Sequence, residues 1–201
     1  MKKRVKLGVF FVVVGFTFSA CSKEDSPPVD ERTFGIFTVQ DDGVTVLANG
    51  DIRTRTLADF NKMIEAFPNI GQIHIKEMPG SLDDETNVQI GRLIYGRNID
   101  THLLDGGLIA SGGVDFYLAG KARTLGNEVM VGVHSWSDGN KEATDFPENA
   151  PEHDLFIDYY KAIGFGDQLA RDFYFFTINA AAADDIHYMS SSEIEKFQLE
   201  R

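Results

Sequence analysis

The first half of the chain alternates between strand-like and helix-like spacing of its hydrophobic residues. Runs rich in β-branched and aromatic residues at 34–39 and 44–47 flank an Asp-Asp-Gly turn, which predicts a β-hairpin. Apolar residues then recur at helical spacing over 57–67 and stop at a Pro-Asn pair, so we expect a helix there. The alternation in 72–76 predicts a strand after this helix.

The second half continues the rhythm. Apolar spacing predicts a helix near 88–94 and a strand over 99–104, which ends before two glycines. Residues 129–133 have the composition of a buried strand, and two more helices are expected near 151–163 and 167–181. Strands that alternate with helices in this way favour a layered α/β fold, in which a mainly parallel sheet is flanked by helices.

The first twenty residues have the organisation of an export signal. Basic residues precede an apolar run from Leu7 to Phe18, and small residues lead directly into Cys21, the only cysteine of the chain. This run is shorter than the roughly 20 residues of a membrane-spanning helix, so we expect cleavage before Cys21; an uncleaved signal anchor is the alternative. The segment Phe18-Ser19-Ala20-Cys21 resembles the lipobox of bacterial lipoprotein signal peptides, which implies a lipid on Cys21 as membrane anchor.

Composition and charge limit the partners of the mature chain. Residues 21–32 are polar and contain prolines, so we expect a flexible tether. This stretch resembles the acidic signal with which some bacteria send lipoproteins to the cell surface. The expected location is therefore the cell envelope, at the outer membrane, with the side that it faces left open. Loss of the four cations in residues 1–20, which contain no Asp or Glu, lowers the net charge from −12 to −16. Nucleic acid and anionic lipid are poor partners at this charge.

Ser111 is the first candidate for chemistry. It follows a predicted strand and precedes Gly112-Gly113 and an apolar helix. The N-terminus of a helix offers unpaired backbone N–H groups and the positive end of the helix dipole, which together can hold the oxyanion of an acyl-transfer intermediate. A serine in this position could equally serve only as the N-cap of the helix.

Four segments together resemble the Clp proteolytic subunit family of the ClpP/crotonase superfamily. Gly107–Gly120 is similar to the family's nucleophile segment, Val131–Ser135 to the strand that delivers its histidine, and Ala183–Ser190 to its acid segment. Ile75–Ser81 resembles the strand and glycine-rich turn that donate an oxyanion N–H. The resemblance covers roughly residues 44–199 and points to a branch of small periplasmic or lipid-anchored ClpP-like proteins. It implies a ClpP/crotonase-like layered fold.

The resemblance also implies roles for individual residues. Ser111 would be the nucleophile and His134 its general base, while Asp185 or Asp184 would orient the imidazole. Two aspartates stay open for the last role because the acid segment fits the family only with a one-residue slip. The implied activity is that of a serine hydrolase, most naturally a peptidase, which attacks a peptide or another acyl substrate and uses no metal or organic cofactor.

The same resemblance assigns the oxyanion hole to backbone N–H groups. One comes from Gly112 and the other from Gly80 or Ser81. The chain has Gly-Ser at this turn where the proteases have two glycines, so the second donor stays open between the two residues. Helices of this superfamily also mediate self-assembly, which adds a homo-oligomer to the expected partners, beside the acyl substrate and the membrane.

Ser135 is a rival nucleophile. Residues 132–137 superficially resemble the nucleophile elbow of α/β-hydrolases, with Asp158 and His187 following in that family's chain order. An elbow needs small residues two positions before and after the serine, yet these positions hold a valine and a serine. This alternative predicts an esterase with a strand-turn-helix over 131–145 and with His187 facing Ser135.

A third hypothesis is a non-catalytic binding or assembly module on the same fold, in which Ser111 and His134 serve packing alone. The five histidines contain no pair at the i, i+4 spacing of a helical zinc site, so no dedicated metal centre is expected. The expected organisation is a signal peptide over 1–20, the lipidated cysteine and tether over 21–32, and a single domain over 33–201.

Overall fold

The computed structural model describes residues 32–201. The predicted signal peptide, Cys21 and all but the last residue of the tether lie outside the described residues. Within the described range, no helix has both the length and the apolar character needed to cross a membrane. One hydrophobic core runs through this range, from Phe37 to Leu199. A fragment that begins at residue 26 therefore keeps every side chain of this core.

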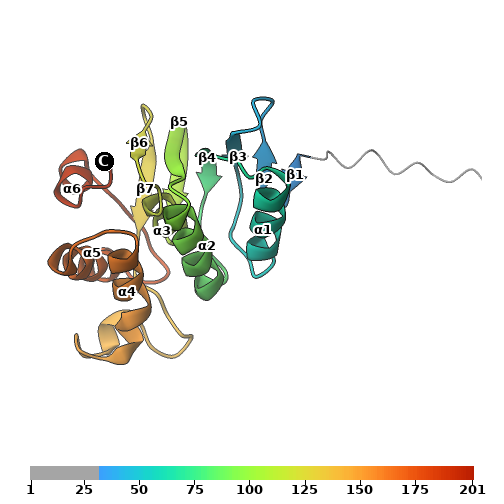
Figure 1. Cartoon of the computed structure of the whole chain (residues 1–201). Coiled ribbons are helices and arrows are strands. Elements are labelled where there is room, and N and C mark those ends of the chain that lie inside the picture. The colour runs from blue at the N-terminus through green and yellow to red at the C-terminus, as the bar shows by residue number, and fades with distance from the viewer. Residues whose placement is uncertain (1–31) are drawn as a thin grey trace, which may run out of the picture.

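One eight-stranded sheet forms the centre of the described part (Figure 1). Its strands are β1 (Thr33–Phe34), β2 (Phe37–Val39), β3 (Thr45–Ala48), β4 (Gln72–Met78), β5 (Asp100–Ala110), β6 (Arg123–Leu125), β7 (Met130–Val133) and β8 (His187–Tyr188). The spatial order is β1-β2-β3-β4-β5-β7-β8, with β6 paired to β5 beside this path. The strand pairs from β3 to β7 are parallel and the outer pairs antiparallel. This mainly parallel sheet confirms the predicted fold class.

Helices pack against the sheet. They are α1 (Thr56–Ala66), α2 (Asp84–Gly96), α3 (Gly112–Leu118), α4 (Asp154–Ala162), α5 (Asp167–Ala180) and α6 (Ser191–Lys196). Figure 1 shows α1, α2 and α3 in front of the strands, α4 and α5 in the region below β7, and α6 beside the C-terminus. Local sequence sets several of these boundaries: the Asp83 side chain caps α2 by accepting from the Thr86 N–H at 3.0 Å.

Most of the predicted elements are confirmed, but the strand predicted over 99–104 is only the first half of β5. The second half continues through two glycines to Ala110 because it finds a different partner. Residues 101–103 pair with β6, whereas residues 108–110 pair with β7. A register shift between Ile75 and Glu77 of β4 accommodates the change. The longer strand carries the chain directly to Ser111.

A buried junction joins α2, α3 and α4. The Tyr159 hydroxyl donates to the main-chain carbonyl of Asp115 at 2.6 Å, and the Tyr160 hydroxyl donates to Asp115 Oδ1 at 2.6 Å. Gly91 of α2 lies directly against Tyr159, since a Cβ atom on this glycine would overlap the tyrosine hydroxyl. The absence of a side chain at residue 91 thus lets α4 approach α2 and hold Asp115 of α3 in place.

Gly91→Ala is expected to destabilise the fold by roughly 1–3 kcal/mol, because the added methyl group must displace Tyr159 from a tightly packed junction. The higher helix propensity of alanine, ~1 kcal/mol, offsets only part of this loss. Gly96→Ala in the same helix is the matched control, since a Cβ atom there would have nothing within 4 Å. Urea unfolding of the fragment from residue 26 measures both variants. Equal midpoints for the two would contradict the packing argument.

The Asp115 carboxyl is buried in this junction, so its ionisation is unfavourable. Burial raises the pKa of Asp115 from the usual 3.8 to about 7; the hydrogen bond from Tyr160 opposes this rise, and the charge of Asp84 adds to it. The folded protein therefore holds this proton more tightly than the unfolded chain does. The resulting stabilisation is complete below about pH 4 and is lost as the pH rises to about 7.

Asp115→Asn should flatten this pH dependence, because an amide oxygen still accepts from Tyr160 and cannot ionise. We expect the variant to be more stable than the wild type at about pH 8 and to differ less at about pH 5. The other titratable groups that face residue 115 are unchanged: Tyr159 and Tyr160 on α4, whose pKa values burial raises, and Asp84 on α2. Urea midpoints across this range provide the measurement. A wild-type slope in Asp115→Asn would assign the pH dependence to other groups.

Candidate active site

Ser111 occupies the junction between β5 and α3, where the backbone turns sharply. Its φ is 51° and its ψ is −129°, a conformation that a residue with a side chain rarely adopts. The Ser111 N–H donates to the Gly132 carbonyl at 3.0 Å, and the Val114 N–H donates to the Ser111 carbonyl at 2.9 Å. The side chain itself makes no capping hydrogen bond. Helix capping therefore does not explain this serine, and backbone strain of this kind is typical of functional sites.

Two glycines follow the turn and let the start of α3 press against the loop after β4. A Cβ atom on Gly112 would overlap the Ser81 side chain, and one on Gly113 would overlap the carbonyl oxygen of Met78. The Asn87 amide group of α2 donates to the Gly112 carbonyl at 2.7 Å and fixes this contact. The Gly-Gly sequence is thus required for the close approach of α3 to the end of β4.

The backbone donors predicted for the oxyanion hole lie together beside Ser111. Gly80 faces the serine, because a Cβ atom there would lie 3.6 Å from Ser111 Cβ and 4.0 Å from Ser111 Oγ. The Ile52 N–H donates to the Gly80 carbonyl at 3.0 Å and holds this loop. The N–H groups of Gly80, Ser81 and Gly112 donate to no acceptor within residues 32–201. All three are therefore free to bind a substrate oxygen.

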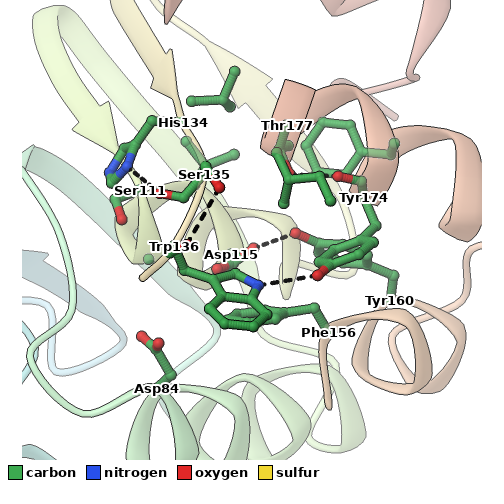
Figure 2. A pocket seen from close by; sticks show the side chains of 15 residues that line it. Asp84, Ser111, Asp115, His134, Ser135, Trp136, Phe156, Tyr160, Tyr174 and Thr177 are labelled. Carbon is green, nitrogen blue, oxygen red and sulfur yellow. Dashed lines mark hydrogen bonds between the residues drawn. The ribbon is translucent and has the colours of Figure 1, made fainter. Parts of the chain in front are cut away.

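His134 follows β7 and lines the same pocket as Ser111, and Figure 2 shows both at one end of it. Its Nδ1 lies 2.6 Å from the Ser135 carbonyl oxygen. Because a carbonyl only accepts, Nδ1 carries the proton and Nε2 is the basic nitrogen. The described residues contain no hydrogen bond between His134 and Ser111; such contacts often tighten only when substrate binds. The imidazole thus has the tautomer that a general base requires.

The aspartates predicted to orient His134 do not reach it. Asp184 and Asp185 are exposed and do not line the pocket. Asp185 Oδ1 accepts from the Ile186 N–H at 2.8 Å, so this carboxylate binds its own segment of chain. The Ser135 carbonyl occupies the position beside Nδ1. The structure therefore brings together the predicted nucleophile, base and backbone donors, and it leaves the predicted acid apart from them.

Asp84 is a pocket residue that the sequence did not predict. It is the first residue of α2, and its half-buried side chain lines the pocket that holds His134. Burial raises the pKa of the Asp84 carboxyl, whereas Ser81 and the charge of His134 act in the opposite direction. In the sequence, an Asp-Asp pair at this position indicates only the start of a helix. The packing of α2 over the sheet, which no local pattern encodes, carries the carboxylate to the site.

The nucleophile elbow at Ser135 is contradicted by the structure. Residues 131–145 do not form a strand-turn-helix: β7 ends at Val133, and only a 3₁₀ turn at Ala143–Asp145 follows. Ser135 is 1% exposed, and its hydroxyl donates to the Trp136 carbonyl at 3.2 Å. A larger polar segment takes the place of the helix that an elbow needs.

The partners predicted for that elbow are also engaged elsewhere. His187 Nε2 lies 3.1 Å from the Glu193 carboxylate. Asp158 is exposed on α4, 3.6 Å from Lys161 Nζ. Neither side chain lines the pocket, so an esterase site built on Ser135, Asp158 and His187 is excluded.

Aromatic side chains form the remaining pocket wall (Figure 2): Trp136, Phe156, Tyr160, Phe173 and Tyr174. Trp136 Nε1 donates to the Tyr174 hydroxyl at 3.0 Å, and this hydroxyl lies 2.7 Å from His153 Nδ1. His153 Nε2 lies 3.1 Å from the Pro147 carbonyl, so Nε2 carries the proton and Tyr174 donates to Nδ1. This chain of hydrogen bonds fixes the Trp136 ring as a rigid wall.

The arrangement is suited to acyl transfer. Ser111 supplies a hydroxyl on a strained turn, His134 supplies a neutral imidazole in the same pocket, and free N–H groups stand beside them. No group of three or more His, Cys, Asp or Glu side chains between residues 32 and 201 is arranged to hold a metal ion.

Comparisons with known proteins agree with this architecture. No protein-family model and no curated protein matches the sequence. ClpP1 from Listeria monocytogenes is 19% identical, with a TM-score of 0.52 over 79% of this chain and 89% of that one. A mutant of the 1510-N membrane-bound stomatin-specific protease, in complex with a substrate peptide, is 20% identical, with a TM-score of 0.50 over 79% and 72%.

An enzyme of another class is similar as well. A putative enoyl-CoA hydratase from Streptomyces coelicolor is 10% identical, with a TM-score of 0.53 over 91% of this chain and 70% of that one. At such identities the likeness concerns the fold and not the activity. The described chain has the layered α/β fold that ClpP-like proteases and crotonase-like enzymes share.

Proposed function

We propose that this protein is a serine hydrolase that acts on peptides or on another acyl substrate. The observation that carries the proposal is Ser111, whose strained backbone presents a hydroxyl in the pocket that also holds His134. The fold occurs in a stomatin-specific protease and in an enoyl-CoA hydratase, so the fold alone does not decide the chemistry. A hydroxyl at the turn, flanked by free N–H groups, favours hydrolysis.

The reaction begins with attack of Ser111 Oγ on the substrate carbonyl. His134 Nε2 takes the serine proton, and the negative charge that forms on the carbonyl oxygen is held by the N–H of Gly112 and by that of Gly80 or Ser81. His134 then returns the proton to the leaving group. Water, activated by the same imidazole, hydrolyses the acyl-enzyme and restores Ser111.

The Ser135 carbonyl takes on the task of orienting the base. Its hydrogen bond with Nδ1 keeps the proton on that nitrogen and directs Nε2 to the nucleophile. The proposal therefore requires no carboxylate to set the tautomer. The assignment of Asp185 or Asp184 to this role stays a prediction.

A non-catalytic binding module is the second candidate. Two observations favour it: the described residues show no hydrogen bond between Ser111 and His134, and the predicted acid lies outside the pocket. The free backbone donors and the strained turn favour the hydrolase over this candidate, since neither is needed for packing.

We also propose that the hydrolase acts in the cell envelope, anchored by lipid on Cys21. The support is the lipobox-like sequence that ends at this cysteine, which is the only one of the chain. Several acyl chains together hold a protein on a membrane durably, whereas one chain does so only marginally. Self-assembly of the domain stays a prediction.

Labelling with a fluorophosphonate probe tests the nucleophile. The fragment from residue 26 should be labelled as wild type and as Ser135→Ala, and Ser111→Ala should remain unlabelled. His134→Ala should react roughly 100-fold more slowly or less, because the general base is lost. Ser135→Ala is the matched control, since it removes a buried hydroxyl and keeps the carbonyl that binds His134. Gel fluorescence gives the rates, and mass spectrometry locates the adduct.

Two outcomes would overturn the proposal. An adduct on a residue other than Ser111 would move the chemistry elsewhere in the pocket. A wild-type fragment that is folded by circular dichroism and is never labelled would contradict the hydrolase and favour the binding module.

Cys21→Ala in the full-length chain should abolish incorporation of radiolabelled palmitate and release the protein from the membrane fraction of a Gram-negative host. The expected reason is that the lipid is the sole anchor. Ser22→Ala, which leaves the cysteine intact, is the control. An unchanged membrane fraction for Cys21→Ala would indicate an uncleaved signal anchor instead.

A further inference from the structure

The pocket beside Ser111 has room for more than the reacting groups. It contains about 480 Å³ of space free of protein atoms, its open mouth included, which is within the usual range for ligand pockets. Figure 2 shows Ser111 and His134 at one end, with Tyr160 and Tyr174 toward the other. A substrate whose carbonyl lies at Ser111 would place one neighbouring side chain in this space.

Two carboxylates line this space without a cation. Asp84 reaches it from α2 and Asp115 from α3. Within residues 32–201, neither forms a salt bridge. Asp115 is 7% exposed, and only its Oδ1 has a hydrogen-bond partner, the Tyr160 hydroxyl at 2.6 Å. The second oxygen of a buried carboxylate is therefore left for whatever occupies the pocket.

The two carboxylates are close enough to act on each other. The charge of Asp84 contributes to the raised pKa of Asp115, and burial raises the pKa of both. A single head group can therefore interact with both. Carboxylates removed from water without a partner are unfavourable, and a cation in this position would remove that penalty.

The aromatic wall suits the same ligand. Faces of Trp136 and Tyr174 attract a cation and also pack against an aliphatic chain. Lysine and arginine combine both properties, because an apolar stem carries a charged head. A purely apolar side chain would leave the carboxylates unpaired, and an acidic one would add a further negative charge.

We infer that this pocket selects substrates with a lysine or arginine side chain next to the scissile bond, and that Asp84 and Asp115 are the residues that determine this specificity. The inference rests on the proposed function, since Ser111 defines where the reacting carbonyl lies.

Binding can be measured without catalysis. Trp136 is the only tryptophan of the chain, so its fluorescence reports on the pocket. In the Ser111→Ala fragment, N-acetyl-lysine amide should bind about tenfold more tightly, or better, than N-acetyl-norleucine amide, which has the same stem without the charge. Asp84→Asn and Asp115→Asn should each reduce this ratio several-fold. Asp83→Asn is the matched control, because it removes a neighbouring charge outside the pocket and keeps a helix cap.

Reactivity supplies the second measurement. Peptidyl diphenyl phosphonates that carry a lysine or a norleucine side chain at phosphorus should label Ser111 at rates that differ by about tenfold or more in favour of lysine. The fluorophosphonate probe, which has no such side chain, should label wild type and Asp115→Asn equally. This second probe reports on the hydrolase function alone.

The outcomes separate the inference from the proposed function. Norleucine amide that binds as well as lysine amide would overturn the inference, while fluorophosphonate labelling of Ser111 would still support the hydrolase. Lysine-selective binding by a protein that no phosphonate labels would overturn the hydrolase and, with it, the substrate role of the pocket. A lysine preference that survives both Asp84→Asn and Asp115→Asn would overturn the assignment of these residues. Slower fluorophosphonate labelling of Asp84→Asn, at an unchanged lysine-to-norleucine ratio, would assign Asp84 to His134 instead.

Discussion

The close approach between the start of α3 and the loop after β4 determines the geometry of the whole site. Gly112 and Gly113 have no Cβ atom, so α3 can touch this loop, and the chain must then turn sharply at Ser111 with a φ of 51°. The same approach places Gly80 against the serine side chain and leaves the N–H groups of Gly80, Ser81 and Gly112 without acceptors in the described chain. One backbone constraint therefore produces both the exposed hydroxyl and the donors that an oxyanion needs. Asn87, which holds the Gly112 carbonyl, ties this constraint to α2.

The second feature of the site is a separation between the group that orients the base and the groups that carry negative charge. The Ser135 carbonyl fixes the proton on His134 Nδ1 as a carboxylate would, but it carries no net charge and stabilises an imidazolium less. Negative charge comes instead from Asp84, whose interaction with His134 lowers the pKa of the Asp84 carboxyl against the effect of burial. This charge lies inside the pocket and not behind the imidazole. It therefore acts on the base and on the occupant of the pocket at the same time.

The sequence predicts those elements whose hydrophobic pattern repeats, because burial of one face leaves a period along the chain. Helices α1 and α5 and strand β4 belong to this class. The Ser111 turn could also be predicted, since a serine and two glycines between a strand and a helix have few other uses. The full length of β5 could not, because a register shift in β4 and a change of partner extend it. Asp84 could not be predicted either: its local sequence is the same whether the start of α2 faces solvent or a pocket. Asp185 fitted a family pattern, yet its carboxylate binds the Ile186 N–H and stays outside the site.

Charge balance in the pocket connects recognition with chemistry. The oxyanion that forms on attack by Ser111 is a new negative charge in a space already lined by Asp84 and Asp115. In a poorly solvated site these carboxylates oppose the oxyanion, because like charges repel more strongly there than in water. A cationic head group near both carboxylates cancels this opposing field while the carbonyl is in place. A neutral occupant leaves the field uncancelled, or leaves a proton on Asp115. The substrate that the pocket binds best is then also the one whose transition state is most stabilised, so part of the binding energy lowers the barrier to reaction.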